Sequence, residues 1–198
     1  MKIVNRHKNQ LIKPVIISLI LSINCLAQSV DFFRENINID ICDTSCSLKG
    51  AYYFKNVDET PVSRTLYYPF VINHELPVPD SISVFDRTRS AEIKYVLSKS
   101  GILFPLEIPE RSIVVIDIFY HQKTPASKFE YILLTTQEWH KPLDSAEFRC
   151  VIPQGLHISH MSYPFKKINS DAKGTVYSFR KRNFAPEKNL TIKWADKK

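Results

Sequence analysis

The chain has 198 residues, with 27 basic and 20 acidic side chains and a formal net charge of +7. Four glycines in the whole chain argue against the Gly-rich loops that hold phosphates or dinucleotides, and the 12 prolines disfavour long helices. The sequence also lacks a GxSxG elbow, an HExxH pair and an EF-hand loop, so these common motifs of hydrolases, zinc peptidases and calcium sites are missing.

The first 27 residues have the pattern of a secretory signal peptide. Residues 1–13 hold four basic side chains and no acid, and the apolar run at 14–26 is shorter than the roughly 20 residues of a membrane span. Cys25 and Ala27 are small residues at the positions that a signal peptidase reads, so we expect cleavage after Ala27. Lipidation of Cys25 is the less favoured alternative, because Asn24 stands where lipoprotein signals have a small residue.

Removal of this signal changes the charge of the protein. Four of the 27 basic residues and none of the 20 acids lie in the removed segment, which leaves 23 against 20 and a formal charge of +3. These charges are spread along the chain, so we do not expect nucleic acid as a partner. Residues 28–198 suit a single domain, which at this size needs neither a metal nor a disulfide to fold.

From residue 36 onward, apolar and polar residues alternate in short segments separated by Pro, Asn, Asp and Ser. Ile37, Ile39 and Ile41 share one face, and the one helical turn that we expect lies within 30–36. This period of two predicts an all-β fold, namely an antiparallel β-sandwich that is immunoglobulin-like or a related Greek key. The predicted strands are 36–42, 46–56, 66–72, 82–85, 93–97, 102–108, 112–122, 129–136, 146–152, 156–161, 175–180 and 190–194.

The segment LTTQEWHKPLDSAEF at 134–148 is predicted as a corner between two strands. Proline cannot donate a ladder hydrogen bond, so it enforces the exit from one sheet. We expect Trp139 to fold over the open end of the sandwich, with Leu143 and Ala146 beneath it. The alternative is an exposed Trp139 that, beside His140, forms a platform on which a ligand stacks.

Three patterns together resemble a group of known proteins. They are LTTxxWxxPLxxAxF at 134–148, GxYxFxN at 50–56, and NFAP followed by LxIxW within 183–194. The chain resembles exported bacterial β-sandwich domains of unknown function that are predicted as immunoglobulin-like, over about 46–194. The resemblance implies an exported sandwich and carries no catalytic residue over to this chain.

Three cysteines follow the signal. If Asp43, Thr44 and Ser45 form a three-residue hairpin loop, Cys42 and Cys46 face each other within disulfide reach, and we predict this bridge. A Cys46–Cys150 bridge and three reduced, buried thiols are the alternatives. Metal binding at Cys42 and Cys46 is not expected, because a structural zinc site needs a second pair of ligands.

Histidines and one acid are the remaining candidates for chemistry. His157 and His160 have the look of a metal pair, but residues three apart on a regular strand point to opposite faces. Asp117 interrupts an apolar strand, and we expect it on the polar side of the sheet. His121 shares its face but lies about 13 Å away along the strand, too far for direct contact.

Two classes of function remain open. The first is a non-catalytic module of the cell envelope that binds an envelope protein or a glycan, or packs into an assembly, and for which no cofactor is expected. The second is an envelope hydrolase or metal-dependent enzyme that uses His157, His160 or Asp117, and it requires several of these side chains to converge in one pocket. In both, the expected location is the periplasm, the cell surface or the extracellular space, with membrane contact only through the export signal.

Overall fold

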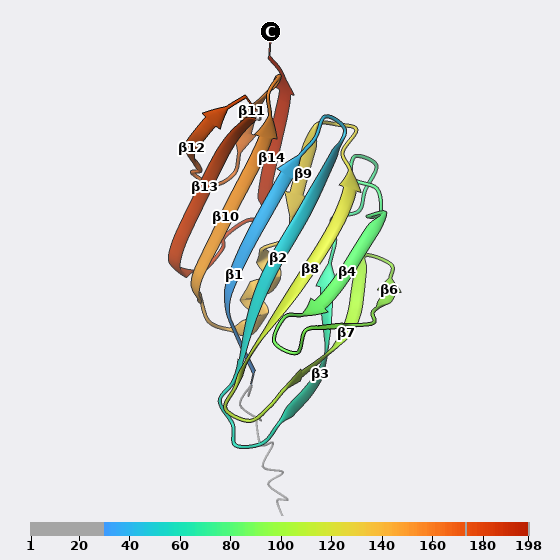
Figure 1. Cartoon of the computed structure of the whole chain (residues 1–198), viewed down its shortest axis with the longest axis vertical. Helices are drawn as coiled ribbons and strands as arrows, with labels where there is room; N and C mark the ends of the chain where they lie inside the picture. Colours follow the sequence, from blue (N-terminus) through green and yellow to red (C-terminus); the bar gives the residue numbers. More distant parts are fainter. Residues whose placement is uncertain (1–29, 173, 198) are drawn as a thin grey trace, which may run out of the picture.

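A computed structural model describes residues 30–172 and 174–197, which form an all-β protein (Figure 1). The predicted signal peptide at 1–27 and Cys25 lie outside the described residues. The elements are β1 (Val30–Ile41), β2 (Ser45–Asn56), β3 (Val62–Pro69), β4 (Ser81–Asp86), β5 (Ala91–Glu92), β6 (Val96–Ser98), β7 (Gly101–Ile108), β8 (Ile113–Lys123), β9 (Lys128–Tyr131), the 3-10 helix η1 (Leu134–Trp139), β10 (Leu143–Pro153), β11 (Leu156–Met161), β12 (Lys166–Asp171), β13 (Gly174–Phe184) and β14 (Leu190–Asp196).

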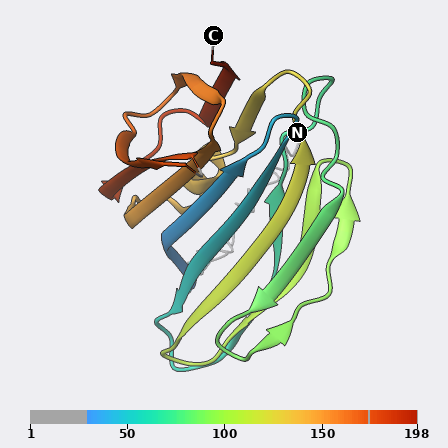
Figure 2. The same ribbon diagram turned by 45° about the horizontal axis from the view of Figure 1, so that its top comes forward.

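The strands form one large sheet and two small ones. The large sheet has eight strands in the order β12-β13-β10-β1-β2-β8-β4-β5, and the small sheets are β11-β14-β9 and β3-β7-β6. Both small sheets lie against one face of the large sheet, which is strongly twisted (Figures 1 and 2). Tyr52 of β2 packs on Tyr68 of β3, and Phe148 of β10 packs on Tyr131 of β9, so aromatic rings join the layers.

The all-β prediction is confirmed, but a purely antiparallel sandwich is not formed. β1 and β10 run parallel, with Ile37 opposite Phe148 and Ile39 opposite Cys150. This pair makes the large sheet mixed and distinguishes it from the two antiparallel sheets of an immunoglobulin-like fold. Parallel strands cannot be joined by a tight hairpin, and here most of the chain lies between the two.

The alternation seen in the sequence corresponds to burial. Ile37, Ile39 and Ile41 are buried on the inner face of β1, and they belong to a continuous hydrophobic cluster that extends through all three sheets. The helical turn expected within 30–36 is not present, because β1 begins at Val30 and this segment pairs with β2. No helix in the described ranges is long and apolar enough to cross a bilayer.

The predicted Cys42–Cys46 disulfide is not formed. The hairpin loop between β1 and β2 has two residues instead of three, because Cys42 donates its backbone N–H to the Ser45 carbonyl at 2.8 Å and Ile41 pairs with Cys46. The shift of one residue sends the two side chains to opposite faces: Cys42 is exposed and Cys46 is buried, and both thiols are free.

A Cys46–Cys150 bridge is prevented by the strand order. Cys46 lies on β2 and Cys150 on β10, and β1 runs between these strands. Two strand spacings amount to about 9–10 Å, whereas the Cα atoms of a disulfide lie within about 7 Å. The free thiols of Cys46 and Cys150 are therefore part of the hydrophobic core.

We expect iodoacetamide to modify Cys42 in the folded protein, and Cys46 and Cys150 only after unfolding. Burial raises the pKa of both inner thiols, that of Cys150 to about 12, and also blocks access. Peptide mapping by mass spectrometry, before and after denaturation and without a reductant, measures this. Recovery of a peptide that links Cys42 to Cys46 would contradict the structure.

Candidate ligand-binding cavity

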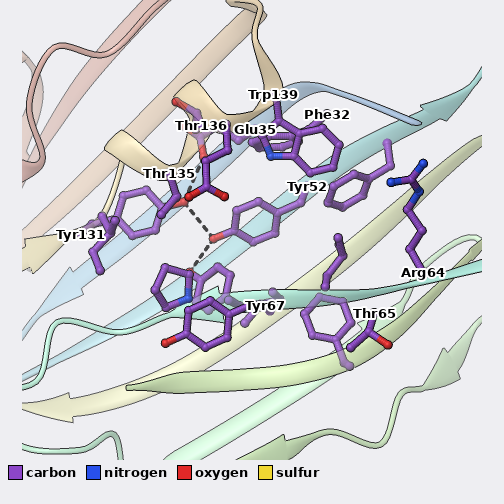
Figure 3. A pocket seen from close by; sticks show the side chains of 18 residues that line it. Phe32, Glu35, Tyr52, Arg64, Thr65, Tyr67, Tyr131, Thr135, Thr136 and Trp139 are labelled. Atoms are coloured by element: carbon purple, nitrogen blue, oxygen red, sulfur yellow. Dashed lines mark hydrogen bonds between the residues drawn. The ribbon is translucent and has the colours of Figure 1, made fainter. Parts of the chain in front are cut away.

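A cavity of about 450 Å³ lies between the inner face of the large sheet, the strand β3 and the helix η1 (Figure 3). Phe32 of β1 and Tyr52 and Phe54 of β2 contribute buried aromatic walls. Arg64 and Glu138 also line it and are exposed, so the cavity reaches solvent on their side. Its volume falls within the roughly 300–1,000 Å³ of small-molecule sites.

Glu35 is a fully buried carboxylic acid that lines this cavity, with an exposed fraction of 0%. It faces inward in phase with Ile37 and Ile39, and a β-bulge aligns Phe32 with it: the register of β1 against β2 shifts between Phe32 and Arg34, which leaves Phe33 as an extra residue. On a regular strand Phe32 and Glu35, three residues apart, would point to opposite faces. The bulge brings Phe32 to the inner face as well.

Three tyrosine hydroxyls extend from Glu35 in a row of hydrogen bonds (Figure 3). Tyr131 donates to Oε2 of Glu35 at 3.0 Å, the hydroxyl oxygens of Tyr131 and Tyr52 lie 3.2 Å apart, and those of Tyr52 and Tyr68 lie 2.7 Å apart. Tyr131, Tyr52 and Tyr68 belong to three different sheets. The cavity is therefore built where the three sheets meet.

Among the residues that the structure describes, no basic side chain forms a salt bridge with Glu35. Burial raises the pKa of Glu35 from 4.5 to about 7, and the hydrogen bond from Tyr131 lowers it by less. Oε1 of Glu35 is buried and has no hydrogen-bond partner among the described residues. A buried, unsatisfied carboxyl oxygen is costly, and such groups concentrate at functional sites.

Gly50 makes room for the ring of Tyr52. A methyl group at position 50 would collide with the ring and the hydroxyl of Tyr52, which lies over the glycine on the same face of β2. The GxYxFxN pattern at 50–56 thus has a local purpose, because it lets Tyr52 lie flat and reach its two partner tyrosines.

The helix η1 covers one side of the cavity and is held by polar contacts. The hydroxyl of Thr136 donates to the Leu133 carbonyl at 2.7 Å. Oδ1 of Asn189 accepts the backbone N–H groups of Leu133 and Leu134 at 3.1 and 3.3 Å. These bonds tie the start of η1 to the segment before β14, and they fix Thr135 and Trp139 as lining residues.

Trp139 is half-buried, as a corner residue would be, and also lines the cavity. Its ring packs on those of Phe32 and Phe54, each with centroids 5.8 Å apart. His140 ends η1 in the left-handed conformation, is exposed, and lines a separate hollow of about 230 Å³. Trp139 and His140 thus line different hollows.

Asp117 lies on the outer face of the large sheet, as expected from the sequence. Ile116 and Ile118 on either side of it are buried, and its carboxylate accepts hydrogen bonds from the Arg87 guanidinium, with Nε and Oδ2 2.9 Å apart. His121, also on β8, instead contacts Asp80, with Nδ1 and Oδ1 2.6 Å apart.

His157 and His160 lie on β11, in a different sheet from Asp117. The expectation that they point to opposite faces is wrong, because a register shift between Ile158 and His160 inserts an extra residue. His157 is opposite Ala195 and His160 is opposite Lys193, so the two imidazoles share the exposed face of β11. Asp117 does not join them.

Residues 30–172 and 174–197 contain no group of three His, Cys, Asp or Glu side chains that could hold a metal ion. The cavity is lined by aromatic side chains, by tyrosine hydroxyls in a row and by one buried carboxyl. Glu35 was not singled out in the sequence, although it lies in phase with Ile37, Ile39 and Ile41. That acid, continuing an inward-facing apolar pattern, was the available signal.

No protein family and no curated protein matches the chain by sequence. Similar folds occur among solved structures. A "putative nutrient binding protein" from Legionella pneumophila aligns with a TM-score of 0.68 and 15% identity, over 84% of this chain and 67% of that one. This likeness defines the chain as a β-rich domain of that fold.

An M1 zinc metallopeptidase from Deinococcus radiodurans aligns with a TM-score of 0.53 and 8% identity over 84% of this chain. A mutant of the same peptidase gives a TM-score of 0.54 and 9% identity. The chain spans 43% of the length of the peptidase. At these identities the likeness concerns the fold alone.

The pH dependence of stability tests the burial of Glu35. Its contribution to stability is fully present below about pH 4.5 and is lost as the pH rises through about 7, because the unfolded chain ionises first. The loss amounts to about 3 kcal/mol. We therefore expect the free energy of unfolding of Glu35→Gln, minus that of wild type, to be larger at about pH 8 than at about pH 5, as measured by urea unfolding. An equal difference at both pH values would contradict burial of the acid.

Gly50→Ala should displace the ring of Tyr52 and destabilise the fold by about 1–3 kcal/mol. In a Tyr52→Ala background the same substitution should cost much less, because the colliding ring is absent. Urea unfolding of the four proteins of this double-mutant cycle measures the coupling. Additive effects would show that the two residues do not contact.

Proposed function

We propose that this chain is an exported binding module that holds a small organic ligand in the cavity beneath η1. One observation carries the proposal: an aromatic cavity of about 450 Å³ is lined by Glu35, a buried acid with one carboxyl oxygen that no described residue satisfies. A largely apolar hollow with a few convergent polar groups is the usual form of a ligand site. The shared fold with a Legionella protein named for nutrient binding supports the same class of function.

The shape of the site favours a small molecule over the whole envelope protein that the sequence also suggested. A cavity of this volume accommodates a compact ligand, and its aromatic walls suit either an aromatic body or the apolar face of a sugar. A short glycan therefore remains within the proposal. Binding would take place outside the cytoplasm, in accordance with the predicted signal peptide at 1–27.

The alternative of an envelope hydrolase or metal-dependent enzyme that uses His157, His160 or Asp117 receives no support from their positions. Asp117 is engaged by Arg87, and the two histidines lie on a different sheet. None of these three residues lines the aromatic cavity.

A variant that fills the cavity tests the proposal. Thr135 lines the cavity from η1, so Thr135→Trp should occupy it with an indole ring, whereas Leu134→Trp adds the same ring to an exposed neighbour outside it. We expect a thermal-shift screen of small organic compounds to find ligands that raise the Tm of wild type and of Leu134→Trp but leave Thr135→Trp unchanged. Ligands that stabilise all three proteins equally would place binding elsewhere.

A further inference from the structure

The direction of the hydrogen bonds limits what the cavity can offer a ligand. A tyrosine has a single hydroxyl proton. When Glu35 is ionised, the hydroxyl of Tyr131 donates its single hydrogen bond to Oε2 of Glu35. In the contact between Tyr131 and Tyr52 the donor must therefore be Tyr52. By the same reasoning Tyr68 must donate to Tyr52. All three protons then point along the row toward the carboxylate.

The polar atoms in this part of the cavity can therefore accept hydrogen bonds from a ligand but have no proton left to donate. Oε1 of Glu35 has no partner among the described residues, and the oxygen of Tyr68 retains a free lone pair. The surrounding rings, among them Phe32, Phe54 and Trp139, present faces with a negative electrostatic potential. A ligand group that satisfies these surroundings has to supply hydrogen-bond donors and positive charge.

We propose that the cavity recognises an organic cation, a primary or secondary ammonium group on an apolar body, with the ammonium donating to Oε1 of Glu35. This inference rests on the proposed binding function and names its ligand class. The carboxylate provides the charge-assisted hydrogen bond, and the aromatic rings provide cation–π attraction and contact with the apolar body.

The ionisation of Glu35 should make the affinity for a cation depend on pH. In the empty cavity burial raises its pKa to about 7, and a bound cation favours the ionised form, so affinity should rise with pH across this range. Tyr52, Tyr68 and Tyr131 face the carboxyl from β2, β3 and β9, and burial raises the pKa of each, so they stay protonated. The charged groups Arg64 and Glu138 line the exposed side.

Three probes of similar shape test the inference: phenethylamine, 2-phenylethanol and phenylacetate. Titration calorimetry on the full chain near pH 8 should show phenethylamine binding at least about tenfold tighter than either of the others. Glu35→Gln should abolish this preference, since it keeps the volume and loses the charge. Glu138→Gln removes the other lining carboxylate and should preserve the preference.

A measurement on the wild type alone tests the inference even if a variant fails to fold. The affinity for phenethylamine should fall about tenfold or more between about pH 8 and pH 5.5, whereas that for 2-phenylethanol should change little. Equal affinity for the amine and the alcohol, or tighter binding of phenylacetate, would overturn the cation assignment while leaving a ligand cavity in place. If no probe binds, the cation assignment fails. The cavity itself is judged separately, by whether Thr135→Trp removes the stabilisation found in the compound screen.

Discussion

Glu35 of β1 points into the space between the sheets, in phase with Ile37 and Ile39, and the extra residue Phe33 brings Phe32 to the same face. An acid in that position loses its hydration, and the described residues provide no salt bridge to it. A single hydrogen bond from Tyr131 compensates only in part. The fold therefore retains a group that burial alone would disfavour, and a packed apolar side chain would be more stable there.

The neighbours of Glu35 are arranged around this polar group. Tyr131, Tyr52 and Tyr68 come from three sheets, and their hydroxyls meet only because both small sheets pack on the same face of the large one. Gly50 leaves the space in which Tyr52 lies. A polar row that bridges layers in this way specifies how the sheets are placed relative to one another, and any displacement would leave buried hydroxyls unpaired.

Similarity of fold adds context without assigning chemistry. The same architecture occurs in a Legionella protein named for nutrient binding and in part of a zinc metallopeptidase, at 15% and 8% identity. A scaffold that appears with such different descriptions carries its function in local sites. In this chain the cavity around Glu35 combines aromatic walls, a row of tyrosine hydroxyls and one buried carboxyl.

The sequence by itself determined most of the strands and their inner faces, because a period of two in residues such as Ile37, Ile39 and Ile41 follows directly from strand geometry. It missed β12, whose residues are all exposed, and it extended the strand that begins at Phe129 into η1. It could not determine the two-residue loop that separates Cys42 from Cys46, the parallel pairing of β1 with β10, or the bulges in β1 and β11. Each of these depends on which strand lies alongside and in which register. Only the tertiary structure decided that tyrosines from three sheets form a row that ends at Glu35, since the energy of those contacts arises between segments far apart in the chain.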